Sequence, residues 1–370
     1  MSLQVQELMD LIDDLAPPHL ALDYDNVGLQ IGDPRAAVKN IITVLDVDAA
    51  TLDEALQRGA NVIISHHPLI FSPWTAINTG RPEGTLIKAI IQNNVNVFVA
   101  HTNLDIAPRG VNALLAELFE LQDPAVLEVT GFDPLLKLVV FVPKGYEDRV
   151  RGAIADAGGG WIGNYSHCTF QLEGTGTFMP REGSRPFSGE KGELNRVKEF
   201  RLETVLPLSL KALIIRALLE SHPYEEVAYD LYELAREGVP LGLGRVGTLK
   251  EPLTLDKLAA RCKKILRTDR VELWGDRDRV VKKVALCGGS GGSLIKTAAE
   301  RGADVLVSGD LKYHDIRLAQ AVGLALVDAG HDNTEYPIIP WLAGFVQDKI
   351  RERGYTNKVW PVPDKDAGMS

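Results

Sequence analysis

Three short segments of the chain hold histidine close to a carboxylate or to a second histidine, and these residue types bind divalent transition metals. The segments are 65–68 (SHHP), 101–105 (HTNLD) and 330–335 (GHDNTE). His331 and Glu335 are four residues apart, so a helix that begins near His331 would place both side chains on one face, one turn apart. The two histidines of the first segment cannot both point inward from a strand, but from a loop their rings can turn toward two neighbouring ions.

Five side chains of these segments form the candidate ligand set: His66, His67, Asp105, His331 and Glu335. Five imidazole and carboxylate ligands exceed what one tetrahedral ion uses and suit two divalent ions that share a bridging carboxylate, for which Glu335 is the candidate. The set contains no cysteine, which disfavours a purely structural zinc site. Imidazole and carboxylate ligands are compatible with Zn, Fe, Mn, Co or Ni. Two such ions, about 3.5 to 4 Å apart, lower the pKa of a bridging water to near neutrality. The predicted chemistry is therefore hydrolysis by a metal-bridging hydroxide.

A single histidine is more often a hydrogen-bonded core residue than a metal ligand. Here the metal hypothesis rests on the combination, because each of the three segments directly follows a predicted strand. Polar residues in neighbouring loops either orient the ligands or are ordinary turn residues, and they are His101, Asn103, Asp310 and His314. We take Asp310 and His314 as candidate catalytic residues that move a proton during hydrolysis.

The elements that must position these residues alternate between strands and helices at both ends of the chain. In the first third we predict strands over 41–47, 61–65 and 95–100 and helices over 49–58, 85–93 and 110–121. In the last third we predict strands over 284–287, 304–307 and 324–327 and a long helix over 334–350. This alternation is typical of an α/β fold with an open, mainly parallel sheet and helices on both faces. Because the loops after the strands of one such sheet converge on one crevice, we expect the metal ligands to meet there.

The middle of the chain follows a different pattern. We predict a strand over 137–142, a helix over 146–157, a strand-like stretch over 161–172, a hairpin or mobile loop over 174–195, a helix over 208–221 and a strand over 227–234. The order β-α-β-β-α-β is typical of a ferredoxin-like α+β domain. Since Gly-rich segments flank it, we predict a discontinuous α/β metal-binding domain, 1–132 with 238–370, and an inserted domain, 133–237.

Two further motifs have a structural and a binding interpretation. The turn 287–293 (CGGSGGS) between a strand and a helix could bind an anion, but it lacks the spacing of a dinucleotide or phosphate loop, so we favour a tight turn. The segment 222–226 (HPYEE) could bind a ligand, but we favour the end of a helix with aromatic packing.

Composition limits the function classes. The chain has 370 residues, with 40 Lys and Arg against 50 Asp and Glu, and a net charge of −10 makes nucleic acid an unfavoured partner. Its cysteines, Cys168, Cys262 and Cys287, form no disulfide framework and suggest a reducing compartment. Residues 1–15 lack the features of a secretory signal, and no apolar run approaches the roughly 18 residues of a membrane span. We expect a cytoplasmic protein with a small-molecule substrate and no membrane partner.

Taken together, the motifs resemble a known family, the GTP cyclohydrolase I type 2 homologues, also called Nif-three-like or NGG-interacting-factor-like proteins. The resemblance spans the chain and is carried by 24–33 (YDNVGLQIGD), 65–71 (SHHPLIF), 101–105 (HTNLD), 288–292 (GGSGG), 308–315 (SGDLKYHD) and 330–335 (GHDNTE). It departs from the family at Tyr24, where Trp is frequent, and at Asp310, where Glu is frequent.

The resemblance implies a Nif-three-like fold with a dinuclear metal site, and its ligands map onto the same five residues, His66, His67, Asp105, His331 and Glu335. It also implies a ring-shaped homohexamer whose metal sites face an internal cavity. The segment 136–234, with its GTGTFMP and HPYEE motifs, looks like the insert of the family's longer members, which is similar to the CutA and PII folds.

Three functions are compatible with these observations. The first is a metal-dependent hydrolase acting on a small phosphorylated or heterocyclic substrate such as GTP. The alternative is a non-enzymatic, metal-dependent regulator or scaffold whose inserted domain senses a ligand or a protein partner. A weaker third is nucleic-acid binding inside a ring with a basic lining from Arg81, Arg109 and Lys312, against which the net charge speaks.

Overall fold

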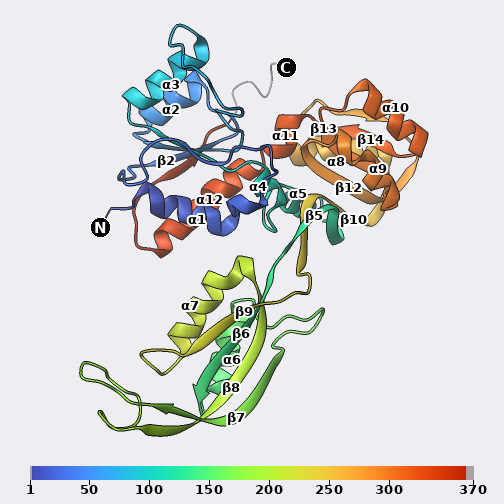
Figure 1. Ribbon diagram of the computed structural model, residues 1–370. Helices are drawn as coiled ribbons and strands as arrows, with labels where there is room; N and C mark the ends of the chain where they lie inside the picture. Colours follow the sequence, from blue (N-terminus) through green and yellow to red (C-terminus); the bar gives the residue numbers. More distant parts are fainter. Residues whose placement is uncertain (1, 364–370) are drawn as a thin grey trace. The chain divides into compact units, whose positions relative to one another are not determined.

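The computed structural model describes residues 2–363, which form two compact units (Figure 1). The first unit combines the two ends of the chain, up to residue 130 and from residue 241 onward, and the second consists of residues 131–240. Within the described residues, no helix combines the length and the apolar character that a bilayer crossing needs.

The first sheet belongs to the first unit and carries two of the predicted site segments. Its strands are β1 (Gly28–Ile31), β2 (Ile41–Val44), β3 (Val62–Ser65), β4 (Asn96–Val99) and β15 (Val359–Pro361), in the order β1-β4-β3-β2-β15. Strands β15, β2, β3 and β4 run parallel, and β1 pairs with β4 in the antiparallel direction. Every residue of β2, β3 and β4 is buried, as expected for parallel strands covered on both faces.

Helices cover the two faces of this sheet (Figure 1). They are α1 (Val5–Leu15) and α12 (Ile338–Glu352) on one face, and α2 (Ala49–Gln57) and α3 (Pro82–Gln92) on the other. Alternate residues of one strand point to opposite faces: Ile41 packs with α1 and α12, whereas Ile42 packs with α2. The predicted strands and helices of the first third are thus present, with ends shifted by a few residues.

The second sheet of the first unit carries the third site segment. Its strands are β5 (Gln122–Asp133), β10 (Val239–Thr254), β11 (Glu272–Trp274), β12 (Val280–Ser290), β13 (Val305–Gly309) and β14 (Ala325–Asp328), in the order β11-β14-β13-β12-β10-β5. Strands β12, β13 and β14 are parallel, while β10 and β11 are antiparallel to their neighbours β12 and β14. Two helices cover each face: α5 (Val111–Leu118) and α8 (Leu255–Leu266) on one, α9 (Ile295–Glu300) and α10 (Tyr313–Val322) on the other.

The fold class is mixed α/β, but the prediction of one open sheet is wrong. The strands of the two chain ends form two separate sheets, because β1 closes an edge of the first set and β10 and β11 flank the second. Strand β10 was missed because it contains most of the segment 238–247 (GVPLGLGRVG), from Val239 onward, whose Gly and Pro residues are typical of a linker.

The second unit is a single antiparallel sheet with two helices. Its elements are β6 (Leu135–Pro143), α6 (Glu147–Asp156), β7 (Thr169–Phe178), β8 (Asn195–Pro207), α7 (Lys211–Ser221) and β9 (Tyr229–Glu233), and the strand order is β7-β8-β6-β9. Both helices pack on the same apolar face, where Ile154 of α6 and Leu218 of α7 meet Val140 of β6.

One strand of this unit lies later in the chain than predicted. The predicted strand over 161–172 is observed only from Thr169, and it extends to Phe178. Gly158, Gly160 and Gly163 adopt positive φ angles, which turn the chain at a point where a strand would need extended backbone. The predicted loop is correspondingly shorter and covers 179–194.

Candidate metal centre

Six side chains of the first unit bring their potential ligand atoms together. They form three overlapping groups, and within each group the atoms lie within 4.8 Å of one another. The groups are His66 with His67 and His101, His67 with His331 and Glu335, and His66 with Asp105 and Glu335. All five residues of the predicted ligand set are members, and His101 is the sixth.

The ends of three strands position these residues. His66 and His67 directly follow β3, and their backbone N–H groups donate to Val44 and Leu45, which prolongs the pairing with β2 beyond the end of the strand. His101 precedes the short helix α4 (Thr102–Ile106), which follows β4 and holds Asp105.

The third segment, 330–335, begins a helix at His331 as its spacing predicts, but the helix is shorter than predicted. Helix α11 (His331–Glu335) begins at His331, and the Nε2 atom of His331 lies 3.2 Å from Oε2 of Glu335. The long helix predicted over 334–350 is divided, because α11 ends at Glu335 and α12 begins at Ile338, with Pro337 between them.

Glu335 lies at the centre of the cluster. Its Oε2 atom is 2.8 Å from Nε2 of His67, and its Oε1 atom is 3.7 Å from Nε2 of His66. On the side of His66, the Nε2 atom is also 3.7 Å from Oδ1 of Asp105. The two oxygens of one carboxylate therefore face two different sets of imidazoles, which is the arrangement that a bridging ligand needs.

The centre lies between two sheets rather than in the crevice of one. His66, His67, His101 and Asp105 follow strands of the first sheet, whereas His331 and Glu335 follow β14 of the second. The expectation of a single crevice is thus wrong in detail, but the rule on strand ends applies to each sheet separately. Two sets of carboxyl-terminal loops meet within the first unit.

Each histidine of the cluster is held by its Nδ1 atom. The partners are the Ala100 carbonyl for His66 (2.9 Å), Asp46 for His67 (3.0 Å), Asp25 for His101 (2.9 Å) and Asp310 for His331 (2.8 Å). An acceptor at Nδ1 keeps the proton on that nitrogen, so the Nε2 lone pair is directed at the cluster. This is the tautomer and orientation that an imidazole ligand requires.

The donor set fits a metal ion. Nε2 of His66 and Oδ1 of Asp105 are buried atoms without a hydrogen-bond partner, and they lie 3.7 Å apart. Leaving such groups unpaired in the interior costs free energy, so a native fold normally supplies a partner. A cation that binds both atoms would be that partner.

The protein groups of the cluster by themselves favour protonated imidazoles. Burial lowers the pKa of His67, but hydrogen bonds to Asp46 and Glu335 outweigh it and raise that pKa to about 10. A hydrogen bond to Glu335 raises the pKa of His331 to about 9 against the effect of burial. Burial raises the pKa of Asp105 to about 6. Metal binding must therefore displace protons from this site.

The two candidate catalytic residues are placed differently. Asp310 follows β13, has a positive φ of 54°, and contacts the cluster through Nδ1 of His331. His314 is exposed on α10, its ring packs against Tyr313, and it lies outside the three groups that the described residues form.

The sequence interpretation underrated three residues. His101 was placed among the orienting residues, yet its ring lies 5.3 Å from that of His66. Asp46 was missed because the predicted strand 41–47 included it, whereas β2 ends at Val44 and leaves Asp46 in the following loop. Asp25 lies in a loop without such a signal; burial raises the pKa of this carboxyl, but hydrogen bonds from His101 and Thr102 outweigh burial and hold it well below its usual range.

Comparisons with known proteins cover nearly the whole chain. The Duf34/NIF3 (NGG1p interacting factor 3) family matches residues 3–366. A Bacillus subtilis (strain 168) protein named GTP cyclohydrolase 1 type 2 homolog is 47% identical over 370 residues, which cover 100% of this chain and 95% of that protein. A crystal structure of a Bacillus cereus protein related to NIF3 has 42% identity and a TM-score of 0.82 over 100% of this chain and 99% of that one. A Staphylococcus aureus crystal structure has 28% identity and a TM-score of 0.70 over the same shares.

The family match includes all six residues of the candidate metal-binding cluster and both sheets that carry them. It also includes the second unit, so the likeness does not stop at the site. The chain belongs to the Duf34/NIF3 family.

Proposed function

We propose that the first unit is a metal-dependent hydrolase with two divalent ions bridged by Glu335. The observation that carries this proposal is the position of the Glu335 carboxylate, with Oε1 toward His66 and Oε2 toward His67 and His331. One ion would be held by His66, Asp105 and Oε1 of Glu335, and the other by His67, His331 and Oε2. When bound, divalent ions supply Lewis acidity and lower the pKa of water, which is the chemistry of hydrolysis.

The protein's own residues orient the ligands and control access. Asp46 and Asp310 fix the rings of His67 and His331 through Nδ1, and Asp25 does the same for His101. The His66 side chain is 0% exposed, whereas those of His67 and His331 are 21% and 34% exposed. A substrate would therefore reach the centre from the side of His67 and His331.

The substrate class is part of the proposal. The curated relatives are named GTP cyclohydrolase 1 type 2 homolog, and that name supports a small phosphorylated or heterocyclic substrate such as a purine nucleotide. We retain Asp310 and His314 as proposed proton-transfer residues, and Asp310 has the stronger support because it contacts His331.

The resemblance supplies further proposals for the rest of the chain. The strand order β7-β8-β6-β9, with two helices on one face, supports a ferredoxin-like insert over 133–237 between the parts 1–132 and 238–370 of the metal-binding domain. A CutA/PII-like character of this insert and a homohexameric ring are proposed on the resemblance alone. A cytoplasmic location is proposed on the three free cysteines, which suit a reducing compartment.

The test of the hydrolase proposal is turnover. The full chain, loaded in turn with Zn, Mn, Fe, Co or Ni, is assayed against nucleotides, phosphate esters and cyclic amides. We expect hydrolysis of at least one class and its loss in His67→Ala with the fold retained, whereas His19→Ala, at an exposed histidine outside the cluster, keeps full activity. Complete metal loading without turnover of any class would favour the regulator or scaffold.

A further inference from the structure

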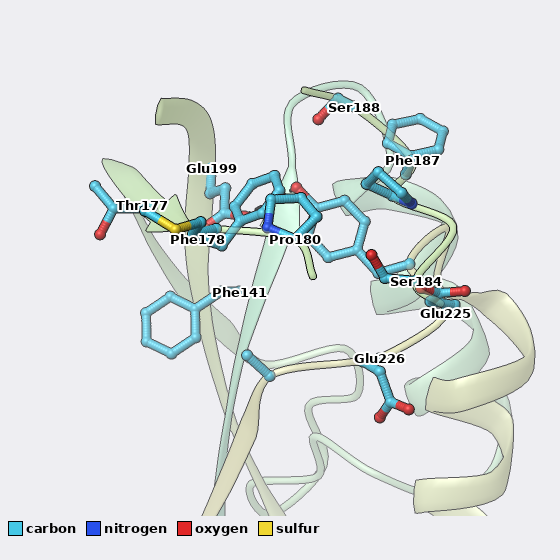
Figure 2. A pocket seen from close by; sticks show the side chains of 15 residues that line it. Phe141, Thr177, Phe178, Pro180, Ser184, Phe187, Ser188, Glu199, Glu225 and Glu226 are labelled. Atoms are coloured by element: carbon cyan, nitrogen blue, oxygen red, sulfur yellow. Dashed lines mark hydrogen bonds between the residues drawn. The ribbon is translucent and has the colours of Figure 1, made fainter. Parts of the chain in front are cut away.

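The second unit contains a cavity that is separate from the metal cluster. Its volume is about 470 Å³, within the range of small-molecule sites. Strands β6, β7 and β8 form one side, and the loop 179–194 and the segment after α7 form the other (Figure 2). All lining residues belong to residues 131–240, so the cavity is complete within this unit.

Four of the fifteen residues that line the cavity are aromatic. The rings are those of Phe141, Phe178, Phe187 and Tyr224. Phe187 lies on the loop, and its ring centroid is 5.8 Å from that of Tyr224 and 5.5 Å from that of Tyr146. In Figure 2, Phe187 lies on the loop side of the cavity, and Phe141 and Glu199 lie on the strand side. Such ring faces carry partial negative charge and attract cations.

A buried carboxylate, that of Glu199 on β8, completes the lining. Glu199 is only 8% exposed, and its Oε1 atom accepts a hydrogen bond from the Tyr224 hydroxyl at 2.9 Å. Burial and the neighbouring Glu199 carboxylate raise the pKa of Tyr224, so its hydroxyl keeps the proton that it donates. Among the described residues, no lysine or arginine forms an ion pair with Glu199. Its negative charge is therefore without a cationic partner.

The backbone of β7 is adapted to this carboxylate. A Cβ atom at Gly176 would lie 2.0 Å from Oε2 of Glu199, so only glycine lets the carboxylate approach the strand this closely. On the loop, Oγ of Ser188 is a buried atom without a hydrogen-bond partner. Glu225 and Glu226 also line the cavity and add negative charge.

We propose that this cavity binds a small organic cation, an ammonium or guanidinium group on an apolar body. The charged group would pair with Glu199 and lie against the rings of Phe187 and Tyr224, and the apolar body would fill the remaining volume. An anion would meet three carboxylates, and a neutral molecule would leave the charge of Glu199 unpaired. The proposal is independent of the hydrolase function, because it uses no residue of the first unit.

The segment 222–226 (HPYEE) thereby has two roles. As predicted, it ends a helix: α7 stops at Ser221, and the rings of His222 and Tyr224 pack with their centroids 4.9 Å apart. It also supplies the hydroxyl that holds Glu199 and two acidic side chains of the lining. The structural interpretation of this motif was correct but incomplete.

Three probes of similar size and different charge test the proposal. Phenethylammonium, 2-phenylethanol and 3-phenylpropanoate are titrated into the full chain and followed by calorimetry and by NMR shifts of the cavity residues. We expect the ammonium probe to bind at least about tenfold more tightly than the alcohol, the difference that one charge-assisted hydrogen bond supplies, and the carboxylate probe not to bind.

Matched variants locate the binding energy. Glu199→Gln keeps an oxygen that accepts from Tyr224 but removes the charge, and we expect about a tenfold loss of ammonium affinity with no change for the alcohol. Glu220→Gln, at an exposed position of α7 outside the cavity, should leave both affinities unchanged. Phe187→Leu, on the loop, should weaken ammonium binding without touching Glu199, and it serves if Glu199→Gln does not fold.

The proposal is overturned by any of three results. The first is equal affinity for the ammonium probe and the alcohol, and the second is no binding of the ammonium probe to the folded chain. The third is that Glu199→Gln leaves the affinity for the ammonium probe unchanged. If Glu199→Gln does not fold, the third result is an unchanged affinity in Phe187→Leu.

Discussion

Gly289 and Glu335 are in such close contact that a side chain at position 289 would collide with the carboxylate. A Cβ atom there would lie 2.2 Å from Oε1 of Glu335 and 3.2 Å from Nε2 of His331. Gly289 also has a positive φ of 66°, and its N–H donates to Oγ1 of Thr334 in α11. The Gly-rich segment 287–293 therefore leaves space for the Glu335 carboxylate at the end of β12. This role differs from both interpretations of the segment from the sequence, a tight turn and an anion site.

The first prediction concerns this contact. Gly289→Ala should displace Glu335 and abolish stable metal binding, and the strained φ should cost about 1–3 kcal/mol of folding free energy. Metal content by mass spectrometry and urea unfolding measure the two effects. The matched control is Gly344→Ala in α12, where the added methyl group meets open space and should stabilise the helix by about 0.5–1 kcal/mol. Normal metal content in Gly289→Ala would show that the carboxylate does not need this position.

The second prediction concerns the carboxylate that orients His67. Asp46→Asn should lower metal affinity by about 10- to 100-fold while the fold stays intact, because the ring loses a charged acceptor at Nδ1. A competition titration against a chelator measures the affinity. Asp53→Asn, at an exposed position of α2, is the control and should have no effect. Equal affinities of the two variants would remove Asp46 from the site.

The third prediction follows from the protons that the metal-free site holds. The pKa of His67 is raised to about 10 and that of His331 to about 9, above their ordinary value of 6.5. Groups of this kind stabilise the fold fully below pH 6.5 and lose that contribution as pH rises through 9 to 10. Chelated protein should therefore lose thermal stability between pH 7 and 10.

The same protons link metal binding to pH. At pH 7 the two imidazoles must lose their protons when a metal binds, so binding releases protons and weakens as pH falls. Calorimetry in buffers of different ionisation enthalpy counts the released protons. A metal affinity that is constant from pH 6 to 8 would be incompatible with this picture.

The fourth prediction concerns a carboxyl remote from the site. Burial, together with Asp10 and Asp14, raises the pKa of Asp13 in α1 to about 6, and its buried Oδ1 atom has no hydrogen-bond partner. Ionisation of Asp13 therefore lowers the free energy of unfolding: the loss is absent below pH 3.8 and complete above pH 6. Asp13→Asn should thus increase the free energy of unfolding by about 1 kcal/mol at pH 7.5, a value that allows for the partial solvent exposure of this group. At pH 4 the same substitution should leave the free energy of unfolding unchanged. Urea unfolding at both values checks the difference, and equal gains at the two values would refute it.

Local patterns in the sequence were sufficient to predict much of this site. The alternation of strands and helices correctly predicted β2, β3, β4 and β12 to β14. The polar residues that follow predicted strands supplied the five candidate ligands, and the structure brings all five together in one cluster. The helical spacing of His331 and Glu335 correctly predicted a helix that begins at His331. These features depend on neighbours in the chain, which periodicity and spacing describe.

Features that depend on distant pairing were not predictable in the same way. The second sheet includes antiparallel strands that pair with distant segments, β11 with β14 and β10 with β12, and the Gly and Pro content of β10 conceals that strand in the sequence. The contact between Asp25 and His101 joins two loops 76 residues apart, and neither residue type nor spacing indicates it. The cavity beside Glu199 likewise needs two loops and three strands in place.

The central claim is that Glu335 bridges two ions, and anomalous X-ray scattering from crystals of the metal-loaded full chain tests it most directly. Data collected on both sides of the metal's absorption edge show where each ion lies. We predict two peaks, about 3.5 to 4 Å apart, one beside His66 and Asp105 and the other beside His67 and His331, with the Glu335 carboxylate between them. A single peak at full occupancy, or two peaks of which one lies away from Glu335, would contradict the proposed centre.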